Sequence, residues 1–338
     1  AYLEGLDRVY ERRNELAFLM TVGANDPVHA GGDLKESLEK LDRTAALKKE
    51  KEQAGASAEE IDALYHWADR RLEKGTALHG KVRTLAHHLR TVAVCGGGTR
   101  FGGSTEIPLM SDYLVGDSRS GMCFSEAMIG LLPGWSGVAR AIIKAGRLNA
   151  QYMAMTGKEV KADQLNAIGI YNAVVEIPLP FPRMSRIGDP KADKAAYAEA
   201  LARHDEETGT VLLPKGLQIA TCPVEDIPVI REPVALAAES EIAEEAKKRR
   251  DPETYAPIRG KSLREVAEEM RKLGRPLAPQ SVRALSDLFA SYTPGDFDEA
   301  AFVKREADAD ARLYRDPKFR AGLTATLEQK VADFREVS

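Results

Sequence analysis

The stretch that most restricts the fold is an apolar run that ends in glycines and is followed at once by a helical pattern. Residues 92–95 form the run, glycines fill positions 96–98 and 102–103, and residues 104–110 have helical spacing. A short apolar run between turn residues is typical of a buried strand, and glycines let a ligand approach backbone amides closely. The pattern therefore predicts a strand, a tight turn and a helix, with the amide of Gly103 at a helix N-terminus that stabilises negative charge.

Two carboxylates flank this turn. Glu106 lies three residues after Gly103, and Glu126 follows a second predicted strand at residues 113–116. Two carboxylic acids beside an oxyanion-binding turn are suited to proton transfer next to a polarised carbonyl group. Taken alone, the same residues are more often an ordinary turn, with Glu126 solvated and Glu106 favouring the dipole of its helix.

Three blocks of sequence, in this order, resemble the enoyl-CoA hydratase/isomerase (crotonase) superfamily. They are a strand at 16–22 followed by HAGGDLK at 29–35, the turn GGSTE at 102–106 with FSEAMIGLLPG at 124–134, and a stretch at 146–175. Three blocks in the correct order and spacing are far more specific than one glycine motif. The resemblance implies an α/β fold, with a crotonase-like ββα-superhelix core and an extended helical C-terminal region.

The resemblance also implies catalytic roles. The amides of Gly32 and Gly103 would form an oxyanion hole for a thioester oxygen, where each donor contributes about 2.7–4 kcal/mol. By position, Glu126 would protonate the α-carbon, and Glu106 would activate water for addition at the β-carbon. The resemblance thus implies an enzyme that works through a thioester enolate.

Further positions bear on substrate binding. By resemblance, Ala30, Gly134 and Trp135 border the acyl group. Trp135 replaces a small residue of the family, so it either packs in the interior or narrows the acyl pocket. Arg100, inside the glycine turn, either faces solvent or pairs with a carboxylate or a CoA phosphate. Asp33 is expected to cap the helix that follows it.

The chain divides into two predicted regions, an αβ core at 1–190 and a helical region at 191–338. Residues 1–15 have the spacing of an amphipathic helix. In the resembled family a hairpin precedes this helix, so either this sequence omits the hairpin or the fold begins differently. A helical insertion is expected at about 36–88, with one break near Gly55 and a capping box after it. Because the insertion borders the acyl pocket in that family, it could shape substrate choice.

The remaining elements follow from periodicity and turn residues. Strands are predicted at 16–22, 92–95, 113–116 and 169–175, and helices of the core at 138–143, 149–155 and 162–168. A stretch rich in Pro and Gly at 178–190 ends the core, and a connector interrupted by Pro occupies 214–233. Helices of the second region are predicted at 195–204, 235–250, 262–273, 279–292, 298–314 and 318–334.

The C-terminal helices carry a second resemblance, to the 3-hydroxyisobutyryl-CoA hydrolases of the same superfamily. It rests on Phe302-x-x-x-Glu306 and on residues 313–325. That branch lacks the carboxylate present here as Glu106, and it has Asp where this chain has Gly134. The tail therefore predicts helical architecture, whereas the site resembles that of hydratases.

Composition excludes several other classes. A net charge of −4, with acidic and basic residues interleaved, gives no basic face for nucleic acid. No apolar run approaches the ~20 residues that span a bilayer. Three cysteines without Cys-x-x-Cys spacing (Cys95, Cys123 and Cys222) and histidines without a ligand pattern (His66, His79, His87 and His88) predict no disulfide framework and no metal site. The cytoplasm is the expected compartment.

The expected function is reversible addition of water to a 2-enoyl-CoA, with no cofactor beyond the coenzyme A moiety of the substrate. Two alternatives within the superfamily stay open: hydrolysis of an acyl-CoA or ring-oxo-acyl-CoA ester, and isomerisation of an enoyl-CoA. A third is a non-catalytic acyl-CoA-binding subunit. Because the resembled family forms trimers or paired trimers, we expect a homotrimer or hexamer.

Overall fold

The computed structural model describes residues 2–16, 18–22, 33–96, 98–175, 218–221, 261–293 and 295–334. The predicted helices at 195–204 and 235–250, and the predicted boundary at residue 190, lie outside these residues. All structural statements below concern the described part of the chain.

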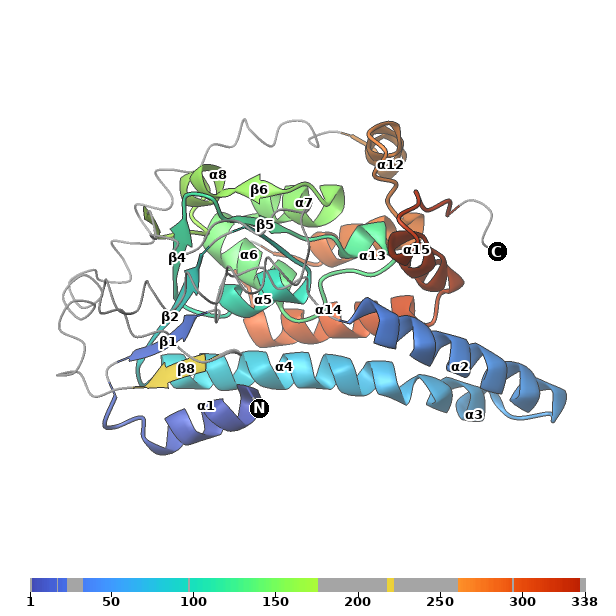
Figure 1. Cartoon of the computed structure of the whole chain (residues 1–338), viewed down its shortest axis with the longest axis horizontal. Coiled ribbons are helices and arrows are strands. Elements are labelled where there is room, and N and C mark those ends of the chain that lie inside the picture. The colour runs from blue at the N-terminus through green and yellow to red at the C-terminus, as the bar shows by residue number, and fades with distance from the viewer. Residues whose placement is uncertain are drawn as a thin grey trace, which may run out of the picture.

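A five-stranded sheet with the strand order β7-β4-β2-β1-β8 forms the centre of this part of the structure (Figure 1). Its strands are β1 (Phe18–Val22), β2 (Arg90–Cys95), β4 (Tyr113–Asp117), β7 (Ala173–Val175) and β8 (Gln218–Thr221). The first four are parallel, and β8 pairs antiparallel with β1. Strands covered on both faces are apolar throughout, which is why β1, β2 and β4 were predictable. The prediction for 214–233 was wrong in part, because β8 lies inside that connector, and β7 is shorter than predicted.

A second sheet, not predicted from the sequence, joins the two segments that carry Glu106 and Glu126. It contains β3 (Thr99–Phe101), β5 (Gly121–Cys123) and β6 (Val160–Lys161) in the order β3-β5-β6. Strands of two or three residues are too short to show a period of two. The parallel pairing of Phe101 with Cys123 places the glycine turn beside the start of the Glu126 segment.

The insertion consists of helices that extend beyond the sheet. They are α2 (Leu34–Gln53), α3 (Ala58–Asp62), the 3₁₀ helix η1 (Ala63–Tyr65) and α4 (His66–Ala86), and α1 (Tyr2–Glu11) precedes them. The predicted caps are confirmed, because Asp33 caps α2 and Ser57 forms a capping box with Glu60. Figure 1 shows α4 as a long rod with α1 below it and α14 (Glu299–Tyr314) above it, and both contact it. No helix in the described ranges is long and apolar enough to cross a membrane.

The helices after the second strand block cover the sheet. These are α5 (Gly103–Leu109), the 3₁₀ helix η2 (Glu126–Met128), α6 (Gly137–Ala145), α7 (Arg147–Thr156) and α8 (Ala162–Ala167). The predicted helices at 104–110, 138–143, 149–155 and 162–168 are confirmed within a few residues. The amide of Gly103 consequently begins α5, as the spacing predicted.

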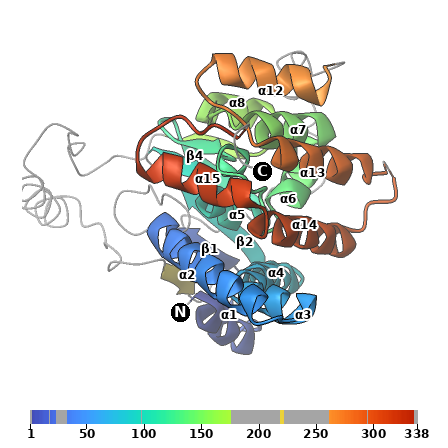
Figure 2. The same cartoon turned by 90° about the vertical axis from the view of Figure 1, so that its right-hand side faces the viewer.

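The C-terminal helices pack onto the αβ part and share its core. Besides α14 they are α12 (Leu263–Lys272), α13 (Pro279–Ala290) and α15 (Pro317–Leu327). Phe302 and Phe319 are buried in the same cluster as Phe124 and Leu132. Figure 2 shows α14 and α15 above α2 and α4, and α15 contacts α2. The helix predicted at 318–334 ends earlier, at Leu327.

Two glycines let α15 approach the backbone of the core directly. A Cβ atom at Gly322 would lie 2.6 Å from the carbonyl oxygen of Ile129. Gly130 has a φ of +94°, and a Cβ atom there would lie 2.8 Å from the Cα atom of Phe319. Because both obstacles are backbone atoms, no side-chain rotation can relieve them.

We predict that Gly322→Ala lowers the free energy of unfolding by about 1–3 kcal/mol through overpacking. Chemical denaturation monitored by circular dichroism measures the change. Gly80→Ala is the matched control: Gly80 lies inside α4, and a Cβ atom there meets nothing within 4 Å. It should raise stability by about 0.5–1 kcal/mol, because alanine replaces a helical glycine. Equal effects of the two substitutions would contradict the close packing of α15.

Candidate functional site

A cavity of about 780 Å³ lies between the glycine turn, the segment after β5, and the helices α4 and α14. Gly103, Glu106 and Glu126 line it, together with Trp135 and Asp310. The predicted site residues that fall within the described ranges thus reach one cavity, although they come from separate parts of the chain. This volume suits a small organic ligand.

Gly103, the predicted oxyanion donor, begins α5 and lines the cavity. As the first residue of α5, it has no acceptor for its N–H within the helix, and the helix dipole adds partial positive charge there. Gly102, immediately before it, has a φ of +56°, which glycine adopts without strain. Gly32, the predicted second donor, and Ala30 lie outside the described residues, so their roles stay predictions.

Glu126 begins η2 and has its carboxyl group buried against the glycine turn. Its exposed fraction is 8%, and a Cβ atom on Gly102 would lie 3.1 Å from Oε1. Its Oε2 has no hydrogen-bond partner among the described atoms. Burial and the charge of Glu106 raise the pKa of Glu126 well above its ordinary value. Glu126 is therefore not a solvated carboxylate, and its surroundings favour the protonated form.

Glu106 is also buried, with an exposed fraction of 3%. Its Oε1 accepts hydrogen bonds from the backbone N–H groups of Trp135, at 2.8 Å, and Gly137, at 3.2 Å. Burial raises the pKa of Glu106 to about 7, although these two amides lower it. A carboxyl group with a pKa near neutrality exchanges protons readily in either direction.

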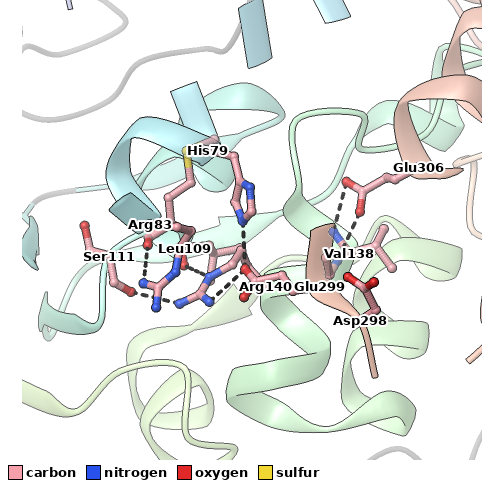
Figure 3. A network of polar contacts seen from close by, with 12 residues as sticks. His79, Arg83, Leu109, Ser111, Val138, Arg140, Asp298, Glu299 and Glu306 are labelled. Atoms are coloured by element: carbon pink, nitrogen blue, oxygen red, sulfur yellow. Dashed lines mark hydrogen bonds and ion pairs between the residues drawn. The ribbon is translucent and has the colours of Figure 1, made fainter. Parts of the chain in front are cut away.

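Two further carboxyl groups, both from α14, hold the backbone next to Glu106. Glu306 accepts hydrogen bonds from the N–H groups of Ala139, at 3.0 Å, and Val138, at 3.4 Å, and Figure 3 shows it facing the start of α6. Asp310 Oδ1 accepts one from the N–H of Leu132, at 3.0 Å. Burial raises the pKa values of both acids well above their ordinary values.

The sequence analysis missed Asp310 and assigned Glu306 to helical architecture alone. A signal was present, because Phe302, Glu306, Asp310 and Leu313 share one face of a helix. Acidic side chains on an apolar face require partners in the interior, and here those partners are backbone amides.

Trp135 and Gly134 form part of the cavity wall. A Cβ atom on Gly75 of α4 would lie 2.4 Å from the Trp135 ring, so the ring lies flat against that helix. A Cβ atom on Gly134 would lie 2.5 Å from Asp310 Oδ2. Trp135 thus packs against α4 and also lines the cavity, and its effect on an acyl group stays a prediction.

Arg100 does not face solvent, which corrects one of the two alternatives expected for it. Its exposed fraction is 4%, and its Nη1 donates a hydrogen bond to the carbonyl oxygen of Gly96, at 3.2 Å. It lines the cavity and links the two ends of the glycine turn.

A polar network centred on Arg140 fixes the far end of α5 (Figure 3). Arg140 donates through Nε to the carbonyl oxygen of Leu109, at 2.8 Å, and through Nη1 to Glu299 Oε1, at 3.0 Å. His79 Nε2 lies 2.7 Å from the same oxygen. Burial would raise the pKa of Glu299, but its contacts with His79 and Arg140 outweigh this and hold it at about 2. His79 thus joins α4 to α14.

The described residues contain no group of three His, Cys, Asp or Glu side chains arranged to hold a metal ion. Cys95 and Cys123 are free and buried, and Cys222 lies outside the described residues. The absence of a metal and of a further cofactor stays a prediction.

Comparisons with known proteins concern both the sequence and the fold. Residues 54–177 match the family model described as enoyl-CoA hydratase/isomerase. This segment contains Gly103, Glu106, Glu126 and Trp135. The match therefore covers the described catalytic candidates but not the C-terminal helices, whose resemblance to 3-hydroxyisobutyryl-CoA hydrolases is not confirmed.

Two solved structures illustrate the similarity of fold. A carnitinyl-CoA dehydratase from Mycobacterium thermoresistibile is 14% identical, with a TM-score of 0.53 over 98% of this chain and 84% of that one. An enoyl-CoA hydratase from Rhodobacter sphaeroides is 17% identical, with a TM-score of 0.48 over 94% of this chain and 79% of that one. The first supports the fold alone, and the second is too distant to support a conclusion.

The family match over the central block and the α/β fold agree with the three sequence blocks. Together they show that residues 54–177 are similar to the enoyl-CoA hydratase/isomerase family and that the fold is similar to that of a solved carnitinyl-CoA dehydratase.

Proposed function

We propose that this protein is an enoyl-CoA hydratase, which adds water reversibly to the double bond of a 2-enoyl-CoA. One observation carries the proposal: Glu106 and Glu126 lie buried on the wall of the same cavity, beside the N-terminus of α5. Hydration needs one group that removes a proton from water and another that supplies a proton to carbon. Two carboxyl groups at one cavity can perform both tasks.

The reaction begins with polarisation of the thioester carbonyl. Its oxygen accepts a hydrogen bond from the N–H of Gly103 and, by family resemblance, from that of Gly32. Glu106 takes a proton from a water molecule while the water oxygen bonds to the β-carbon. The electron pair of the double bond moves toward the thioester oxygen and gives an enolate, which these donors stabilise.

Glu126 then donates its proton to the α-carbon, and the product is a 3-hydroxyacyl-CoA. Glu106 now carries the proton taken from water, and Glu126 has lost one. Transfer of a proton between them restores the starting state, so no other reactant is consumed. Dehydration follows the same steps in reverse.

The environments of the two carboxyl groups support this division of roles. Burial raises the pKa of Glu126 well above its ordinary value, which favours the protonated form that the α-carbon needs. The pKa of Glu106 is about 7, so a large fraction is deprotonated at neutral pH and can act as a base. The Glu106 carboxylate is also the better supported of the two, because two backbone amides bond to it.

The other candidate functions differ from hydration in which of the two glutamates they require. A thioester hydrolase that relies on Glu126 alone would not need Glu106. A non-catalytic acyl-CoA-binding subunit would need neither acid, and exposed, distant glutamates would favour it. The burial of both side chains at one cavity supports catalysis instead. The proposed substrate partner is an acyl-CoA thioester, and a homotrimer or hexamer stays a prediction.

We predict that Glu106→Gln and Glu126→Gln each lower the hydration rate about 10²–10⁴-fold, because each removes one proton-transfer group. Glutamine at 106 can still accept the two amide hydrogen bonds, so the loop should keep its position. Loss of absorbance of the conjugated thioester measures hydration of short and medium 2-enoyl-CoA esters. Glu52→Gln, on the exposed face of α2, is the matched control and should leave the rate unchanged.

Parallel measurement of free thiol release tests the alternative reactions. If Glu106→Gln left turnover intact and thiol were released, the protein would be a hydrolase and the hydratase proposal would be wrong. If neither substitution changed any rate, the two glutamates would not be catalytic.

We also predict a bell-shaped dependence of kcat/KM on pH. Glu106 acts as a base, so activity should fall below pH about 7, where it becomes protonated. Glu126 acts as an acid, so activity should fall again at higher pH, where it loses its proton. Rates measured from pH 5 to 10 test this, and a profile that is flat between pH 5 and 8 would contradict the assigned roles.

A further inference from the structure

Arg71 lies on the face of α4 that forms one wall of the cavity. It lines the cavity itself, and Gly75, one helical turn later, supports the ring of Trp135. Residues four apart on a helix lie on the same side. Arg71 therefore extends the wall that begins with Trp135, and it comes from the helical insertion.

A buried hydroxyl group fixes the position of the Arg71 guanidinium. Nη1 of Arg71 donates to Ser37 Oγ at 3.1 Å, and that hydroxyl donates in turn to the carbonyl oxygen of Asp33, at 2.8 Å. Ser37 has an exposed fraction of 4%. The anchored end of the guanidinium thus lies in the interior, while Lys330, 71% exposed, lines the cavity where it meets solvent.

Arg71 forms no salt bridge in the described ranges, although its charge acts on Glu106 and Asp310 and opposes the rise that burial causes in their pKa values. Arg100, which also lines the cavity, donates a hydrogen bond to the carbonyl oxygen of Gly96. Arg83 and Arg140 form salt bridges with Asp112 and Glu299. The acids of the cavity are engaged elsewhere: Glu106 and Asp310 accept hydrogen bonds from the backbone of the 132–137 segment. A partly buried cation without a salt-bridge partner is costly, and a bound anion would relieve that cost.

We infer that Arg71 is a specificity-determining residue that binds a carboxylate at the end of the acyl chain remote from the thioester. The preferred substrates are then CoA esters of dicarboxylic acids. The inference rests on the proposed function, because it assumes that acyl-CoA esters occupy this cavity. Guanidinium pairs with carboxylate in a two-pronged geometry that gives both strength and specificity.

The acyl end of the substrate, rather than the phosphates of CoA, suits this position. Arg71 shares the cavity wall with Trp135 and Asp310, and the buried Ser37 hydroxyl anchors its guanidinium, so we assign it to the acyl end. Burial raises the pKa of Asp310 well above its ordinary value, which reduces the repulsion between this group and an incoming carboxylate.

Calorimetric binding of saturated esters tests the inference without depending on turnover. Glutaryl-CoA and pentanoyl-CoA have five acyl carbons each and differ by one terminal carboxylate, and adipoyl-CoA and hexanoyl-CoA form a second pair. We expect at least one dicarboxylic ester to bind about tenfold or more tightly than its partner. Free coenzyme A serves as the probe for the phosphate contacts.

Two substitutions on neighbouring positions of α4 locate the effect. Arg71→Met should remove the preference for the carboxylate and leave the affinity for pentanoyl-CoA and free coenzyme A within about twofold. Arg70→Met is the matched control, because Arg70 is exposed on the other side of the helix, and it should keep the preference. Ser37→Ala removes only the anchor and should weaken the preference in part.

Several outcomes would overturn the inference, and they differ from failure of the proposed function. Equal binding within both ester pairs by the unaltered protein would overturn it and leave the hydratase proposal intact. Equal weakening of every ligand by Arg71→Met, free coenzyme A included, would identify Arg71 as a phosphate contact. A shifted pH profile with unchanged preference would mean that Arg71 serves the cavity acids alone. If no ester bound at all, both proposals would be wrong.

Discussion

The site depends on how one buried backbone segment satisfies its amides. Three carboxyl groups, those of Glu106, Glu306 and Asp310, accept hydrogen bonds from five N–H groups between residues 132 and 139. A buried amide without an acceptor costs about 1–3 kcal/mol, so the segment could not stay in the interior without these acids. The segment is also strained, because Ser136 has a φ of +70°. Its shape therefore depends on side chains supplied by α5 and α14.

This arrangement explains why the carboxyl groups have unusual acidities. Bringing several acids into one interior makes each charge more costly, so burial and mutual repulsion raise their pKa values. Burial raises the pKa of Glu106 to about 7, and the amides of Trp135 and Gly137 offset part of that rise. Glu306 also accepts two amide hydrogen bonds, yet burial and the charge of Glu106 raise its pKa well above its ordinary value. The hydrogen bonds that hold the 135–139 backbone in place therefore also influence the pKa values of Glu106 and Glu306.

Sequence reasoning identified what repeats along the chain and missed what depends on distant contacts. Continuous apolar runs predicted β1, β2 and β4, and Ser57 with Glu60 predicted the cap of α3. The three-residue strand β3 has too few residues for a pattern, yet it places the glycine turn beside Glu126. Gly103, Glu106 and Glu126 were identified because the family keeps them in a local motif. Asp310 and Arg71 line the same cavity but come from helices more than two hundred residues apart in the sequence. No local sequence pattern could predict that these two residues lie near each other.

The insertion and the C-terminal helices therefore belong to the site as much as the central block does. α4 supplies Gly75, whose missing side chain leaves room for the Trp135 ring, and α14 supplies Asp310, which a side chain at position 134 would strike. At both glycines, Gly75 and Gly134, the space that a side chain would need is filled by a residue that lines the cavity. The Arg140 network adds a second connection, since His79 of α4 and Arg140 of α6 both contact Oε1 of Glu299, which belongs to α14. Changing the length or tilt of either helix would move the cavity wall and the carboxyl groups together, so the shape of the cavity and the positions of its acids depend on the same two helices.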